Sequence, residues 1–139
     1  MTDSTMTSYA ATTLRLTSGG LFIAHGLLKV LVFTMPGTVG YFESLGLPGP
    51  LAYLIVMAEI IAGVGLLLGI ATRTIALATL PILFGATWAH AGNGWAFSNN
   101  GGGWEFPLFW AVVQLAIAML GGGAYALQPS RAKPVAQPA

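Results

Sequence analysis

The chain has 139 residues, a length that predicts a single domain. Hydrophobic residues make up 55% of the sequence and charged residues only 6%, whereas about 25% of the residues in a soluble domain are charged. This composition excludes an ordinary soluble protein and predicts an integral membrane protein. The net charge of +1 argues against nucleic-acid binding, and the lack of cysteine excludes disulfides, thiolate catalysis and iron–sulfur ligation by this chain.

The chain begins with a Ser- and Thr-rich segment, 1–12, which we expect to be a mobile tail and not a signal peptide. An apolar run at about 14–33 is long enough to cross a bilayer as a helix. Within this run, polar residues and one aromatic residue recur every three or four positions, so they share one helix face that should point into a bundle. This stripe consists of Arg15, Ser18, Phe22, His25 and Lys29.

A second span is predicted at about 51–70, after a connection that Pro and Gly punctuate and that includes a short surface helix. Its only charged residue is Glu59. Small residues recur along this span, and such residues let helix backbones approach closely in a bilayer. We therefore expect tight packing of this helix against a neighbour.

The third and fourth spans are predicted at about 75–91 and 105–126. Pro81 lies inside the third span and predicts a kink just before it. Gln114 lies near the middle of the fourth. Residues 13–127 are thus expected to form an all-α, four-helix transmembrane domain, followed by a disordered Pro-rich tail, 128–139.

The distribution of charge predicts the topology. If the chain crosses the membrane four times, the basic residues near the span ends all fall on one side, and Glu43 and Glu105 fall on the other. The basic residues are Arg15, Arg73, Arg131 and Lys133. By the positive-inside rule, both termini are then cytoplasmic and the two long connections face the periplasm.

The ionisable residues of the spans are expected to meet in the outer half of the bundle. At about 1.5 Å per residue, His25 and Glu59 lie at similar depths, with Lys29 slightly nearer the outer surface. Gln114 has a comparable depth, and His90 lies near the outer end of its helix. Because ionisable groups in a membrane need partners or a watery cavity, this predicts a convergent polar pocket.

Several interpretations of this pocket remain open. Lys29 and Glu59 could form a purely structural ion pair, or they could serve a ligand. His25 and His90 come from different helices, as bis-histidine haem ligation requires, but their depths differ by about 10 Å, which disfavours a b-type haem. We expect no metal site, and the small size of the chain disfavours a transporter unless it oligomerises.

Four segments of the chain carry a resemblance to a known family: LFIAHGLLKV, LGLPGP, AEIIAGVGLLLGIATRTIAL and HAGNGWAFSNNGGGWEFP. Through these segments the chain resembles the DoxX family of small bacterial inner-membrane proteins, from about residue 14 to residue 127. The ordered motifs are HG-x-x-K, then E-x-x-x-G, then G-x-x-T-R. The matching positions are His25, Gly26, Lys29, Glu59, Gly63, Gly69 and Arg73.

The resemblance implies a four-helix inner-membrane protein and suggests an oxidoreductase subunit. The family name derives from a subunit of an archaeal thiosulfate:quinone oxidoreductase, so a quinone is the ligand we expect. In this hypothesis His25 and Lys29 hydrogen-bond or protonate a quinone carbonyl, and Glu59 orients Lys29 or relays the proton. The binding set would also include His90, Gln114 and Trp110, with Trp110 and Phe109 flanking the ring.

An alternative from a different class is a non-catalytic membrane scaffold that anchors a partner enzyme. In that case the two outer connections would carry the function. The expected surroundings are the lipid bilayer and either a partner oxidoreductase subunit or further copies of the chain.

Overall fold

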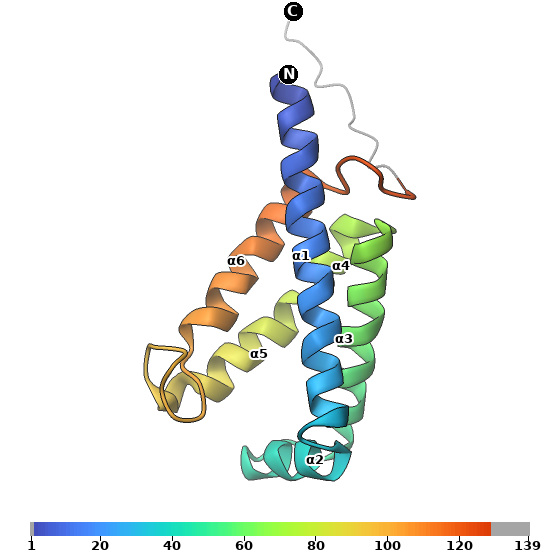
Figure 1. Ribbon diagram of the computed structural model, residues 1–139. Coiled ribbons are helices and arrows are strands. Elements are labelled where there is room, and N and C mark those ends of the chain that lie inside the picture. Colours follow the sequence, from blue (N-terminus) through green and yellow to red (C-terminus); the bar gives the residue numbers. More distant parts are fainter. Residues whose placement is uncertain (1, 129–139) are drawn as a thin grey trace, which may run out of the picture.

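The computed structural model describes residues 2–128, and this part of the chain contains helices and no strands (Figure 1). In chain order the helices are α1 (Asp3–Leu31), α2 (Met35–Ser44), α3 (Pro50–Leu68), α4 (Thr72–Ala78), α5 (Leu80–His90), the short 3-10 helix η1 (Ala91–Asn93) and α6 (Glu105–Leu120). The expected all-helical class and the short helix in the first connection are confirmed.

Helix α1 begins at Asp3, well before the expected start of the first span at residue 14. The Thr2 hydroxyl accepts a hydrogen bond from the backbone N–H of Thr5, and Asp3 places a negative charge at the positive end of the helix dipole. The hydroxyls of Thr7 and Thr12 donate to carbonyls one turn earlier. Side chains that suggested a polar tail therefore lie within a capped helix.

Helices α1 and α3 run antiparallel, side by side, over most of their length (Figure 1). Their backbones touch at two glycines. A Cβ atom added to Gly19 would lie 2.9 Å from the carbonyl oxygen of Gly63, and one added to Gly63 would lie 2.6 Å from Ile23. The small residues of the second span thus form a close contact between helices, as expected in a bilayer.

The third span is interrupted at Thr79, which separates α4 from α5. Pro81 lies in the first turn of α5, where its missing N–H removes no helical hydrogen bond. The Thr79 hydroxyl donates to the carbonyl of Ala76 at 3.0 Å. The predicted kink before Pro81 is confirmed, and α5 leads away from the α1–α3 pair (Figure 1).

Helix α6 ends at Leu120 and not at residue 126. Gly121 has a φ of 86°, a left-handed conformation that favours glycine, and the chain turns there out of the helix. The following segment, 121–128, crosses the end of the bundle. There the Leu127 N–H donates to the carbonyl of Leu68 at 3.0 Å, near the end of α3. Of the predicted tail, 128–139, only Gln128 is described, and its N–H donates to the carbonyl of Gly69; residues 129–139 lie outside the described residues.

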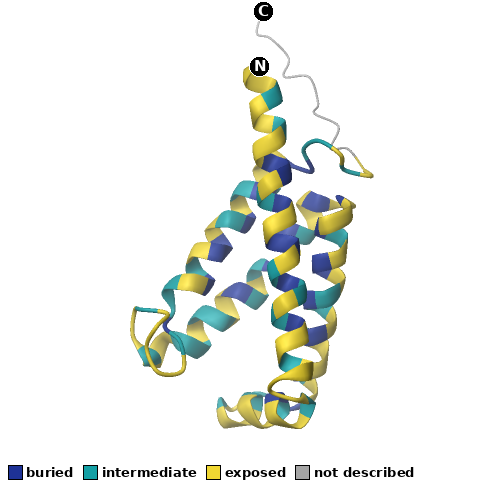
Figure 2. Cartoon of the chain, in the orientation of Figure 1, coloured by how far each residue is buried: buried dark blue, intermediate teal, exposed yellow. Residues whose placement is uncertain are grey.

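Three helical stretches of the described chain are long and apolar enough to cross a membrane: Asp3–Leu31, Pro50–Leu68, and Thr72–Asn93, which comprises α4, α5 and η1. Helix α6 is apolar but shorter, at 16 residues. Buried residues face the inside of the bundle, while exposed ones cover its outer faces (Figure 2). Many of the exposed side chains are large and apolar, including Met57, Ile61 and Met119, as expected for a surface in contact with lipid.

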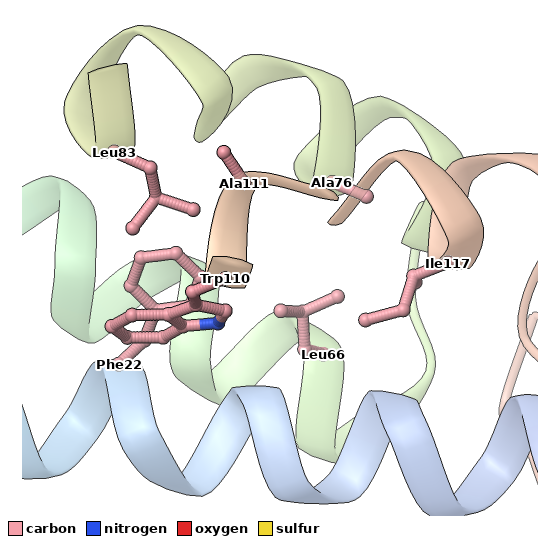
Figure 3. Close-up of a cluster of buried hydrophobic side chains, with 7 residues drawn as sticks. All are labelled: Phe22, Leu66, Ala76, Leu83, Trp110, Ala111 and Ile117. Carbon is pink, nitrogen blue, oxygen red and sulfur yellow. The ribbon is translucent and has the colours of Figure 1, made fainter. Parts of the chain in front are cut away.

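The core is a cluster of seven buried side chains from α1, α3, α4, α5 and α6 (Figure 3). Its members are Phe22, Leu66, Ala76, Leu83, Trp110, Ala111 and Ile117. The Phe22 and Trp110 rings pack with their centroids 4.3 Å apart. This aromatic pair joins α1 to α6, and Trp110 also lines the candidate site.

Candidate functional site

A cavity of about 360 Å³ lies between α1, α2, α3, α5 and α6. Most of its lining is apolar and includes Leu45 and Leu47 after α2, Ile55 of α3 and Ile82 of α5. The lining also includes the charged side chains of Lys29 and Glu59 and the imidazoles of His25 and His90. An apolar cavity with a few convergent polar groups is the usual form of a small-molecule site. We refer to it as the central cavity.

Lys29 and Glu59 form an ion pair between α1 and α3. The ammonium nitrogen Nζ lies 2.8 Å from Oε1 and 2.9 Å from Oε2, so one cation engages both carboxylate oxygens. The side chain of Glu59 is 6% exposed and that of Lys29 is 21% exposed. Two of the three ammonium hydrogens are used in this pair, and the third has no acceptor among the described residues.

The local sequence explains why these two side chains meet. Gly26 lies one turn before Lys29, and a Cβ atom there would lie 2.8 Å from Ile60. The absence of a side chain at Gly26 thus lets α1 approach α3 next to Glu59. Thr38 of α2 donates to the backbone carbonyl of Lys29 at 2.9 Å, which ties α2 to the end of α1.

His25 is held by its backbone and by two aromatic rings. Its Nδ1 lies 2.9 Å from the carbonyl oxygen of Leu21, one turn earlier in α1. Its ring stacks on Phe106 with centroids 6.0 Å apart and an interplanar angle of 16°, and it lies 5.1 Å from the Trp110 ring. Because a carbonyl only accepts hydrogen bonds, Nδ1 carries the proton. The other ring nitrogen, Nε2, is unpaired among the described residues.

His90 is held in a similar way at the end of α5. Its Nδ1 lies 3.0 Å from the carbonyl oxygen of Gly101 and 3.2 Å from that of Gly102. The Asn93 amide donates to the same two carbonyls. That amide also lies 3.5 Å from His90 Nδ1, but the shorter distances to two carbonyls assign the proton to Nδ1. These bonds tie the connection 91–104 to α5.

Two other predicted site residues meet at a serine inside the bundle. The indole N–H of Trp110 donates to Ser18 Oγ at 2.8 Å, and the Gln114 amide donates to the same oxygen at 2.9 Å. Trp110 also lines the central cavity, whereas Gln114 is fully buried and is not among the lining residues. The structure therefore brings His25, Lys29, Glu59, His90 and Trp110 to one cavity and leaves Gln114 in the core.

The aromatic partner of Trp110 is Phe106 and not Phe109. Phe106 lies one helical turn before Trp110, on the same face of α6, and both line the cavity. Phe109 is largely exposed and does not line it. Tyr41 and Phe42 of α2 also line the cavity, a role that their position in the first connection did not predict.

Arg15 has a different role from the other members of the polar stripe. Its side chain is 1% exposed and binds only backbone carbonyls among the described residues. Nη1 donates to Leu66 and Leu67 at 2.6 and 2.7 Å, and Nε donates to Gly122 at 2.8 Å. Arg15 lies near the middle of α1 and joins the end of α3 to the segment after α6, about four helical turns before Lys29.

The described residues contain no group of three or more His, Asp or Glu side chains arranged to hold a metal ion. The central cavity offers a ligand an ammonium N–H, a carboxylate, two imidazole nitrogens and several aromatic faces. Such a set can hydrogen-bond and stack against a planar ring that carries oxygen substituents.

Comparison with known proteins gives a consistent family assignment. Residues 10–92 match the model of the DoxX family. The chain is 41% identical over 73 residues to a Bacillus subtilis (strain 168) protein named "Putative oxidoreductase CatD", and this alignment covers 52% of the chain and 53% of that protein. It is 32% identical over 116 residues to the inner membrane protein YqjF of Escherichia coli (strain K12), covering 77% of the chain and 80% of YqjF.

The chain thus spans about half the length of CatD and four fifths of YqjF. No solved structure matches it. The family match covers more than half of the chain and includes His25, Lys29, Glu59 and His90. The chain therefore belongs to the DoxX family and is a multi-pass protein of the bacterial inner membrane.

Proposed function

We propose that this protein is a membrane subunit of a quinone-linked oxidoreductase and that its central cavity binds the quinone headgroup. The observation that carries the proposal is the meeting of His25, Lys29 and Glu59 at one largely apolar cavity beside the rings of Phe106 and Trp110. A flat ring with polar oxygens fits such a lining. The name of CatD supports an oxidoreductase role, although the alignment covers only half of that protein.

The chemistry of the site would come mainly from Lys29. Its third ammonium hydrogen could donate to a quinone oxygen and stabilise the negative charge that develops there when electrons arrive. Glu59 would hold the ammonium in place. Reduction of a quinone to a hydroquinone takes two electrons and two protons. We propose that the two electrons come from a partner dehydrogenase and the two protons from water; this chain has no cysteine with which to hold an iron–sulfur cluster of its own.

The proposed topology has four membrane crossings and two cytoplasmic termini. It is supported by the arrangement in Figure 1, where the start of α1 and the end of α6 lie at one end of the bundle, and α2 and the connection 91–104 lie at the other. Helix α6 is about 24 Å long at about 1.5 Å per residue. A helix slightly shorter than the hydrocarbon core can still cross where the bilayer thins locally. In this topology the central cavity lies toward the periplasm.

The test is to identify what the protein retains through purification. Wild-type protein, Lys29→Met and Phe109→Leu would be purified in mild detergent, and their bound small molecules extracted and identified by mass spectrometry. We expect a quinone in the wild type and in Phe109→Leu, whose side chain lies outside the cavity, and its loss in Lys29→Met. Equal retention in all three proteins would contradict the proposal.

The same experiment addresses the other candidates. A Soret band in the visible spectrum, lost in His25→Phe and in His90→Phe, would indicate haem. Wild-type protein that retains no ligand and gives the same profile as Lys29→Met would favour a scaffold for a partner enzyme. Replacement of the connection 91–104 should then abolish the activity of that partner.

A further inference from the structure

The two histidines that line the central cavity share a feature that restricts the ligand. In each, Nδ1 lies at hydrogen-bonding distance from backbone carbonyl oxygens: Leu21 for His25, and Gly101 and Gly102 for His90. A carbonyl oxygen has no hydrogen to donate, so in both rings Nδ1 is the donor. In a neutral imidazole the other nitrogen, Nε2, then carries a lone pair and can only accept.

In its neutral form, His25 therefore offers the cavity an acceptor and not a donor. Its Nε2 has no partner among the described residues, and its ring is fixed between Phe106 and Trp110. A change of tautomer that moves the proton from Nδ1 to Nε2 would break the hydrogen bond to Leu21. A ligand that covers His25 without donating a hydrogen bond would leave Nε2 desolvated and unpaired, which is unfavourable.

Lys29 supplies the complementary group. Its third ammonium hydrogen is a donor, next to a carboxylate that already has two hydrogen bonds. The exposed side chains Tyr41 and Trp88 at the cavity add further donors. A ligand oxygen that accepts from a donor of this kind and also donates to His25 Nε2 must be a hydroxyl. A quinone carbonyl can accept from Lys29, but it has no hydrogen for His25.

We infer that the central cavity prefers the reduced, dihydroxylated ring, a hydroquinone, over the corresponding quinone. The inference rests on the proposed function and specifies the redox state of its ligand. A site built to pair with a hydroxyl discriminates against an analogue that lacks it, because the partner group is left unsatisfied. A second consequence follows by linkage: preferential binding of the reduced form raises the midpoint potential of the bound couple.

The test compares three probes that differ only in their oxygens: a decyl-substituted 1,4-benzoquinone, its hydroquinone, and the dimethyl ether of that hydroquinone. Equilibrium dialysis against full-length protein in mild detergent, without oxygen, would give a dissociation constant for each. For the wild type we expect the hydroquinone to bind at least about tenfold more tightly than the other two probes, a ratio that corresponds to about 1.4 kcal/mol.

The variant His25→Phe keeps an aromatic ring at this position and removes the acceptor, and Phe109→Leu is the control outside the cavity. His25→Phe should abolish the preference by weakening hydroquinone binding, and Phe109→Leu should keep the preference.

Equal binding of quinone and hydroquinone to the wild type would overturn the inference and leave the proposed function standing. Failure of all three probes to bind would overturn both. If His25→Phe weakened the binding of all three probes equally, His25 would contribute only to the shape of the cavity, and the inference would also be overturned.

Discussion

The ammonium group of Lys29 donates to both carboxylate oxygens of Glu59, at 2.8 and 2.9 Å, across the contact between α1 and α3. Taking two charges out of water is costly, and their attraction in a medium of low dielectric offsets this cost only while both are present. Burial of either charged side chain is therefore favourable only while its partner is present. For this reason, replacing one residue and replacing both can distinguish a structural role of the pair from a role in ligand binding.

Replacing one partner should destabilise the protein more than replacing both. We expect Lys29→Met to lower the free energy of unfolding by about 3 kcal/mol, because Glu59 would be left buried without its cation. The double variant Lys29→Met/Glu59→Met should recover most of this loss. Thermal loss of the helical circular dichroism signal in detergent would measure the effect. A double variant less stable than either single one would contradict the prediction.

The same comparison clarifies the ligand experiment. If the double variant regains stability but still retains no quinone, loss of the ligand cannot be attributed to unfolding. If it regains both, the ion pair serves structure only, and the cavity does not use Lys29.

Adjacent glycines of α1 offer a matched test of the α1–α3 contact. A Cβ atom at Gly19 would lie 2.9 Å from the carbonyl oxygen of Gly63 and 3.0 Å from the backbone N of Leu67, so the helices would have to separate. A Cβ atom at Gly20 would meet nothing within 4 Å. We expect Gly19→Ala to destabilise the protein by about 1–3 kcal/mol, as overpacking does.

Gly20→Ala should be neutral or stabilising by up to about 1 kcal/mol, because alanine is the better helix former. The midpoints of thermal unfolding of the two variants, measured side by side, would decide the matter. Equal effects at both positions would show that the close approach of α1 and α3 contributes little to stability.

The parts of the site that could be predicted follow from the cost of charge in a membrane. His25 and Lys29 share a helix face by their spacing, and a carboxylate at similar depth is the partner that their burial demands. Pro81 likewise predicted the break at Thr79, because a proline within a helix removes a hydrogen bond and clashes with the preceding turn. These inferences need only local periodicity and depth.

The parts that could not be predicted depend on the reach of side chains and on single backbone angles. Gln114 has the expected depth, but its amide turns to Ser18 and away from the cavity. Phe106 and Phe109 are equally aromatic, and only their angle around α6 separates the cavity wall from the exposed face. The apolar residues after Leu120 suggested a longer helix, although Gly121 ends it with a positive φ.

Arg15 should hold the segment 121–128 against the end of α3. Its guanidinium donates from Nη1 to Leu66 and Leu67 and from Nε to Gly122. A lysine at this position keeps the charge but has one nitrogen in place of three, so it cannot bridge the two segments in the same way. We expect Arg15→Lys to lower the free energy of unfolding by about 2–3 kcal/mol.

Hydrogen exchange gives a local measure of the same effect. The Leu127 N–H donates to Leu68 and the Gln128 N–H donates to Gly69, so both amides should be protected in the wild type. In Arg15→Lys their exchange should accelerate more than that of the amides in the middle of α3. The exposed Arg73 provides the control, and Arg73→Lys should leave these rates unchanged. Unchanged protection in Arg15→Lys would show that the segment holds itself in place.

The proposed topology can be tested with single cysteines, because the chain has none of its own. Ser4 is exposed near the start of α1, and Ser98 is exposed in the connection 91–104, at the opposite end of the bundle. Of the described basic residues, Arg15 and Arg73 lie toward the end of the bundle that holds Ser4, which the positive-inside rule assigns to the cytoplasm. In intact spheroplasts a membrane-impermeant maleimide should therefore label Ser98→Cys and not Ser4→Cys.

After permeabilisation of the spheroplasts both cysteines should react, which controls for their intrinsic accessibility. Labelling of Ser4→Cys alone in intact spheroplasts would show that the protein has the opposite orientation, with the open side of the central cavity toward the cytoplasm. Labelling of both in intact spheroplasts would mean an even number of crossings between the two positions, and the four-helix topology would fail.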